Sequence, residues 1–211
     1  MARARLWGPM PLKNSIQHVK QNVDLEIFVD GGIEHFKNRF HPAQAFWIGD
    51  ADSLKKNLPS ALLDKHRIFL NPEKSFSDLQ AALKTLPNQK SLTIDAFGFM
   101  GGRIDHEFIN LGCACSMMKK RKWQSITFWN PTRGKDTVQS VHILNQDRKH
   151  SFKFLGTFSI FSFKKQKVHL TGQLQYSGMI NLPAHTSLGL SNFAHGTFHI
   201  KPSSPLILFM N

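Results

Sequence analysis

The run SLTIDAF at residues 91–97, followed by GFMGG at 98–102, decides the fold. A helix-like segment comes next at 105–118, with a basic end at 119–122, and SITFW follows at 125–129. The two apolar runs are rich in β-prone residues, and the basic end suits the carboxyl terminus of a helix. A strand, a glycine-rich turn, a helix and a second strand in this order are typical of a parallel sheet with helical connections.

The residues before this stretch repeat the pattern. LEIFV at 25–29 runs into Asp-Gly-Gly, and AFWI at 45–48 runs into Gly-Asp. Residues 77–86 place apolar side chains at helical spacing, with Ser77 in the position of an N-cap. We therefore expect residues 1–130 to form an α/β domain with an open, mostly parallel, Rossmann-like sheet.

The sequence changes character after residue 130. The helical signal fades, and β-rich runs at 138–144, 151–163, 167–174 and 196–210 are separated by glycines and a proline. Several short strands with regular turn signals are typical of a small sandwich or barrel. We expect residues 131–211 to form a small all-β sandwich domain.

Composition narrows the classes of protein that fit. The 211 residues include 27 Lys and Arg against 14 Asp and Glu, a formal charge of +13, and 41% are hydrophobic, which excludes a disordered or collagen-like chain. A net positive charge of this size suggests a nucleic-acid partner, but the sequence contains no pattern of a known nucleic-acid-binding motif. The two cysteines, Cys113 and Cys115, are too few for a disulfide framework, and no apolar run is long enough for a signal peptide or a membrane span. These features favour a reduced, cytoplasmic protein.

Aspartates follow the expected strands. Asp30, Asp50 and Asp52 come directly after two of the strands, and Asp105 follows the glycine-rich turn after another. Ligands of open α/β sheets bind beyond the carboxyl ends of the strands, where carboxylates gathered together need a cation. Oxygen ligands alone favour Mg²⁺, which commonly bridges to the phosphates of a nucleotide. The alternative is that these aspartates are turn formers and helix caps.

Four blocks taken in order resemble the thiamine pyrophosphokinase family. VDGG at 29–32, IGDADSL at 48–54, KSFSD at 74–78 and GGRIDHEFINL at 101–111 are similar to the family's ADGG, IGDFDS, KDxTD and GGRxDH. In the second part, GTFSIFSF at 156–163, TGQLQY at 171–176 and LSN at 190–192 resemble further family segments. The resemblance spans nearly the whole chain.

The resemblance implies an enzyme that transfers the pyrophosphoryl group of ATP to the hydroxyl of thiamine and releases AMP. It implies a homodimer with active sites between subunits, and a β-sandwich that binds thiamine. Asp50, Asp52 and Asp78 would hold Mg²⁺, while Asp30 and Asp105 would lie beside the reacting hydroxyl and the phosphates. The residues implied to bind ATP and thiamine are Gly31, Gly32, Lys74, Gly101, Gly102, Arg103, Tyr176, Ser191 and Asn192.

The blocks also depart from the family pattern. Ser75 stands where the family has the first Asp of KDxTD, Ser77 replaces its Thr, and Ala51 replaces a larger residue between two aspartates. Two alternatives therefore stay open. One is a pyrophosphokinase for another hydroxymethyl acceptor such as a pterin, and the other is a non-enzymatic nucleotide- or nucleic-acid-binding protein.

Overall fold

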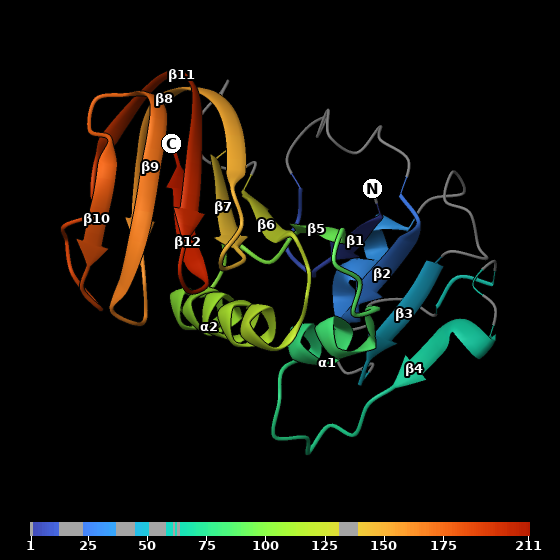
Figure 1. The fold of residues 1–211 in the computed structure, drawn as a ribbon. Helices are drawn as coiled ribbons and strands as arrows, with labels where there is room; N and C mark the ends of the chain where they lie inside the picture. Colours follow the sequence, from blue (N-terminus) through green and yellow to red (C-terminus); the bar gives the residue numbers. More distant parts are fainter. Residues whose placement is uncertain are drawn as a thin grey trace.

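The computed structural model describes residues 2–12, 23–36, 45–50, 58–60, 62, 64–130 and 139–211. These residues form one twelve-stranded mixed sheet with two α-helices (Figure 1). The strand order is β10-β9-β11-β8-β12-β7-β6-β5-β1-β2-β3-β4. The protein is therefore mostly β, with the early part of the chain at one end of the sheet and the late part at the other.

The first six strands pair only in parallel with one another. They are β1 (Arg3–Trp7), β2 (Leu25–Val29), β3 (Ala45–Gly49), β4 (Arg67–Phe69), β5 (Thr93–Phe97) and β6 (Ser125–Asn130). The expected open, parallel sheet is present over these strands, and the run at 25–29 is a strand with the bounds read from the sequence. Strand β4 has three residues and was not foreseen.

Two α-helices and two short 3₁₀ segments accompany these strands. The helices are α1 (Asp78–Thr85) and α2 (Ile104–Lys120), and the 3₁₀ segments are η2 (Asp30–His35) and η4 (Asp64–His66). Ser77 caps α1 as expected, since its hydroxyl accepts a hydrogen bond from the Gln80 amide at 3.2 Å. Both helices lie on the same side of the sheet in Figure 1, so the Rossmann-like description, with helices on both faces, is not confirmed for the described residues. Neither helix has the length and hydropathy that crossing a bilayer requires.

The second part of the chain continues the same sheet. Strand β7 (Gln139–Leu144) pairs antiparallel with β6, and the later strands pair antiparallel with one another. They are β8 (His150–Phe161), β9 (Gln166–Leu174), β10 (Gly178–Leu182), β11 (Asn192–Pro202) and β12 (Leu206–Met210). The sequence run at 196–210 is thus two strands, separated at Ser203–Pro205, and β10 was not foreseen.

The helices bury one face of the parallel strands. Alternate residues of β1 and β5, such as Leu6 and Ile94, pack in one apolar cluster with Leu83 of α1 and Met118 of α2. A separate cluster that includes Phe158 and Phe198 fills the second part. The parallel strands are thereby fixed on a rigid base, which holds the loops at their carboxyl ends in place.

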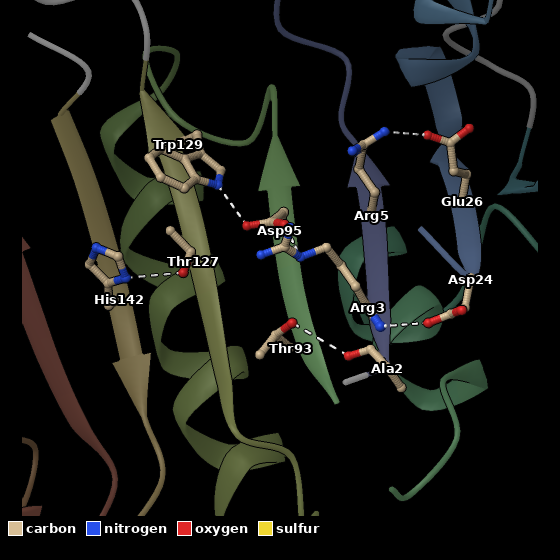
Figure 2. A network of polar contacts seen from close by, with 10 residues as sticks. All are labelled: Ala2, Arg3, Arg5, Asp24, Glu26, Thr93, Asp95, Thr127, Trp129 and His142. Atoms are coloured by element: carbon tan, nitrogen blue, oxygen red, sulfur yellow. Dashed lines mark hydrogen bonds and ion pairs between the residues drawn. The ribbon is translucent and has the colours of Figure 1, made fainter. Parts of the chain in front are cut away.

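The opposite face of the parallel strands carries charges (Figure 2). Arg5 on β1 forms a buried ion pair with Glu26 on β2, with Nη1 and Oε1 2.8 Å apart. Arg3 contacts Asp95 on β5 at 3.3 Å, and the same carboxylate accepts a hydrogen bond from the Trp129 indole at 2.9 Å. These polar contacts link the four adjacent strands β2, β1, β5 and β6. Loss of either partner of the buried Arg5–Glu26 pair would leave an uncompensated charge.

His142 on β7 extends this polar face into the second part. Its Nδ1 lies 3.0 Å from the Thr127 hydroxyl and its Nε2 lies 2.8 Å from the Ser140 hydroxyl. Burial, with a smaller contribution from the charge of His150, lowers the pKa of His142 to about 4. His142 is therefore neutral in the folded protein at pH values where an unfolded chain already protonates it.

This burial makes stability fall in mild acid. Below the ordinary histidine pKa of about 6.5 the unfolded state gains a proton that the folded state does not take up until about pH 4. We expect His142 to lower the free energy of unfolding by about 2 kcal/mol between pH 7 and pH 5. Urea denaturation at both pH values measures this loss, and His142→Gln should make it smaller by that amount. An equal loss in the variant would contradict the assignment.

Candidate active site

Three aspartates gather at the carboxyl edge of the parallel strands. Asp30 follows β2 at the start of η2, Asp50 follows β3, and Asp78 begins α1. Because β2 and β3 are neighbouring parallel strands, their carboxyl ends meet at one edge of the sheet. The charges of Asp30 and Asp50 both act on Asp78, so the three carboxylates share one electrostatic environment.

Lys74 lies between two of these carboxylates. Its Nζ is 2.5 Å from Oδ2 of Asp50 and 3.1 Å from Oδ1 of Asp78. The side chains of Lys74 and Asp50 are each only 9% exposed. Burial alone would lower the pKa of Lys74, but its hydrogen bonds to the two carboxylates outweigh burial and raise that pKa. For Asp78 burial is the largest influence, and the neighbouring carboxylates add to it, so the pKa of Asp78 is raised despite Lys74.

Asp30 is held by its backbone with its side chain buried. Its φ of 49° is in the left-handed region, and its carbonyl accepts a hydrogen bond from the Trp47 indole at 3.0 Å. Its Oδ1 is buried without a hydrogen-bond partner among the residues that the structure describes. A buried carboxylate oxygen with an open lone pair is costly unless a ligand or an ion satisfies it. This atom is the clearest indication that the site binds something.

The glycines next to Asp30 and Asp50 allow close backbone packing. A Cβ on Gly32 would lie 1.9 Å from the Trp7 carbonyl oxygen, and a Cβ on Gly49 would lie 2.9 Å from the Asp30 Cα. Both positions therefore need glycine for contact with the neighbouring strand or turn. The expected phosphate contacts of Gly31 and Gly32 stay a prediction beside this packing role.

The glycine-rich loop before α2 is closed by a carboxylate of its own helix. Oε1 of Glu107 accepts hydrogen bonds from the amides of Gly101 at 2.7 Å and Gly102 at 3.0 Å. Arg103 and Asp105 pair with each other at the surface, with Nη2 and Oδ2 2.6 Å apart, and this hydrogen bond lowers the pKa of Asp105. The loop amides can hold an anion, and in this structure the anion is Glu107. Sequence reasoning missed Glu107, although an acid in the first turn of the helix was a visible signal.

Tyr176, Ser191 and Asn192 form a second group. The Tyr176 amide donates to Oδ1 of Asn192 at 3.1 Å, and Nδ2 of Asn192 donates to the Tyr176 carbonyl at 2.8 Å. Tyr176 is 62% exposed, and Ser191 has a φ of 57°. The group lies at the ends of β9 and β11, and β11 is seven strand spacings from β2, about 34 Å along the sheet. One chain therefore does not place this group beside the aspartates.

Asp52 and Ala51 lie outside the described residues, so the expected metal set is seen only in part. Within the described residues, no group of three or more Asp, Glu, His or Cys side chains is arranged to hold a metal ion. The donors that are present still fit a hard cation: they are carboxylate oxygens, one of them buried and open, around a site that already holds an ammonium group. Cys113 and Cys115 are free thiols.

Residues 16–127, just over half of the chain, match the family described as thiamin pyrophosphokinase, catalytic domain. The chain belongs to the thiamin pyrophosphokinase family. The match contains Asp30, Lys74, Asp78 and the loop at Gly101. No curated protein sequence matches the chain.

Solved structures of this family share the fold over nearly the whole chain. The thiamine pyrophosphokinase of Bacillus subtilis superposes with a TM-score of 0.71 at 17% identity, covering 98% of this chain and 97% of that one. The Candida albicans enzyme gives 0.70 at 12% identity, with 99% and 88% covered. A probable thiamine pyrophosphokinase from Staphylococcus saprophyticus gives 0.57 at 20% identity, with 99% and 97% covered. At these identities the similarity establishes the fold.

Proposed function

We propose that this protein transfers a pyrophosphoryl group from ATP to the hydroxyl of thiamine, with Mg²⁺, giving thiamine diphosphate and AMP. The observation that carries the proposal is the family match together with the grouping of Asp30, Asp50 and Asp78 at one sheet edge. In this reaction the thiamine hydroxyl oxygen bonds to the β-phosphorus of ATP. The bond from that phosphorus to the α,β-bridging oxygen breaks, and AMP leaves with the bond electrons.

The described residues supply positioning and charge. Asp50 and Asp78, with Asp52, would hold Mg²⁺, which neutralises triphosphate charge when bound. Asp30 or Asp105 would take the hydroxyl proton, and the buried, open Oδ1 of Asp30 favours Asp30. Lys74 and Arg103 would pair with phosphate oxygens, and the amides of Gly101 and Gly102 would bind a phosphate once Glu107 moves away.

The thiamine half of the site would come from a second copy of the chain. Tyr176, Ser191 and Asn192 lie far along the sheet from the aspartates of their own chain, so a site that uses both groups needs two subunits. Four apolar side chains on β8, on β10 and in the segment before β11 are exposed and offer a surface for that contact: Leu155, Met179, Leu188 and Leu190. An aromatic face such as the Tyr176 ring also suits the cationic thiazolium of thiamine.

A mixed dimer tests this arrangement. A dimer made only of Asp50→Asn chains, or only of Tyr176→Ala chains, has the substitution in both of its sites and is impaired. If each site is shared between subunits, a mixed dimer has one site that carries both substitutions and one site that carries neither. Random mixing should restore about a quarter of the wild-type activity at low thiamine concentration. Light scattering should give twice the chain mass of 24.0 kDa. No recovery in a verified mixed dimer would contradict a site between subunits.

The acceptor is tested separately by thermal unfolding. With Mg²⁺ and a non-hydrolysable ATP analogue present, thiamine should raise the melting temperature, because it binds only the folded state. A hydroxymethyl pterin should leave it unchanged. A rise with the pterin and none with thiamine would favour the other acceptor class.

Two broader expectations belong to this proposal. We retain a division into an α/β catalytic part at 1–130 and a thiamine-binding β part at 131–211, supported by the change from parallel to antiparallel pairing between β6 and β7. We also propose a cytoplasmic location, consistent with the two free cysteines.

A further inference from the structure

We infer that Lys74 is a built-in counter-ion that occupies the cation position between Asp50 and Asp78, so that a divalent metal must displace its ammonium group in order to bind. The inference rests on the proposed metal site and concerns how this chain regulates access to it. It predicts weak binding of metal alone and strong cooperation between metal and nucleotide.

The local structure holds Lys74 in this place. Its amide donates to the Asn71 carbonyl at 3.1 Å, which closes a turn before α1. Asp78 follows four residues later in the first turn of α1, and Asp50 arrives from the end of β3. The ammonium group is thus fixed by a turn on one side and by carboxylates from two separate elements on the other.

The charges explain why the pair needs an occupant. Asp50 and Asp78 both contact one Nζ, and Asp30 lies close enough to act on Asp78. Carboxylates this close repel one another strongly when the site is shielded from water. Lys74 pairs with two of the three, its single positive charge balances only one of them, and Oδ1 of Asp30 stays open. An incoming metal ion and the ammonium group would therefore compete for the same oxygens.

Nucleotide changes the balance. When metal arrives alone, the displaced ammonium group loses two ion pairs and gains only water. When metal arrives with a triphosphate, phosphate oxygens can take the place of the lost carboxylates as partners of Lys74. The metal affinity of the wild-type protein should therefore rise at least tenfold when a non-hydrolysable ATP analogue is present, beyond the binding of metal by the analogue itself.

The experiment measures Mn²⁺ binding to the full-length protein by electron paramagnetic resonance, without nucleotide. Lys74→Met should bind Mn²⁺ at least about tenfold more tightly than wild type, and its gain from the ATP analogue should be smaller. Lys90→Met, which removes an exposed positive charge elsewhere, should bind as wild type does. A folded Lys74→Met protein with wild-type Mn²⁺ affinity would overturn the inference.

Labelling of the wild-type protein gives a second readout that needs no folded variant. The Lys74 side chain is 9% exposed and is paired with Asp50 and Asp78, so an amine-acylating reagent should modify it slowly when a chelator keeps the protein free of metal. Saturating Mn²⁺ should increase its labelling, detected by peptide mass spectrometry, while Lys90 stays constant. Unchanged Lys74 labelling at full Mn²⁺ occupancy would overturn the inference.

Asp50→Asn separates this inference from the proposed function. If Asp50→Asn does not weaken Mn²⁺ binding, the metal site itself is wrong and the proposed mechanism fails with it. If Asp50→Asn removes Mn²⁺ binding and the wild-type protein forms thiamine diphosphate, but Lys74→Met does not tighten binding, then only the role of Lys74 is wrong.

Discussion

Asp50→Asn is expected to lower the rate of thiamine diphosphate formation by about 1000-fold or more, with the fold retained. Asp50 is one of two carboxylates that share Lys74, and the proposal makes it a metal ligand at the end of β3. An amide of the same shape keeps one oxygen but carries no charge, so it binds Mg²⁺ poorly. Initial rates with ATP, Mg²⁺ and thiamine measure the effect.

A matched substitution controls for the chemical change. Asp147 is exposed in the turn after β7 and has a φ of 59°, which Asn also tolerates. Asp147→Asn removes the same charge in the turn between β7 and β8, away from the aspartates that follow β2 and β3. It should leave the rate within about twofold of wild type. Equal rates for both variants would show that Asp50 is not part of the site.

Gly32→Ala is expected to destabilise the protein by about 3 kcal/mol or more. The added Cβ would lie 1.9 Å from the Trp7 carbonyl oxygen and 2.6 Å from its carbonyl carbon. These atoms belong to the backbone at the end of β1, so no side chain can turn aside to make room. Either η2 moves away from the sheet, carrying Asp30 with it, or the backbone of β1 shifts.

Gly112→Ala on α2 is the matched control. Apart from its chain neighbours and the backbone of its own helix, no heavy atom of the described residues lies within 4 Å of a Cβ at Gly112, and alanine is a better helix former than glycine. We expect the free energy of unfolding of this variant to be about 0.5–1 kcal/mol higher than that of the wild-type protein. Urea denaturation of the three proteins gives both numbers. If Gly32→Ala is as stable as Gly112→Ala, the close approach of η2 to β1 is wrong.

Local patterns predicted the elements that rest on local chemistry. The LEIFV run gave β2, and Ser77 capped α1, because both depend on neighbouring residues alone. No local pattern in the sequence showed that Arg3 and Arg5 of β1 would meet Asp95 and Glu26. Strand pairing determines those contacts, and a short strand such as β4 carries too few residues to show a period.

The same limit applies to the candidate site. The positions of Asp30 and Asp50 after strands were visible, because parallel strands bring such loops to one edge. The pairing of Lys74 with Asp50 joins residues 24 positions apart, and nothing local reports it. The separation of Tyr176 from the aspartates followed only from the strand order.

Product analysis tests the central claim most directly. The purified wild-type protein is incubated with ATP, Mg²⁺ and thiamine, and the products are separated by ion-exchange chromatography. We expect thiamine diphosphate and AMP in equal amounts, and neither product when Mg²⁺ is chelated. A folded, dimeric protein that forms no thiamine diphosphate, or that forms thiamine monophosphate with ADP, would contradict the proposed function.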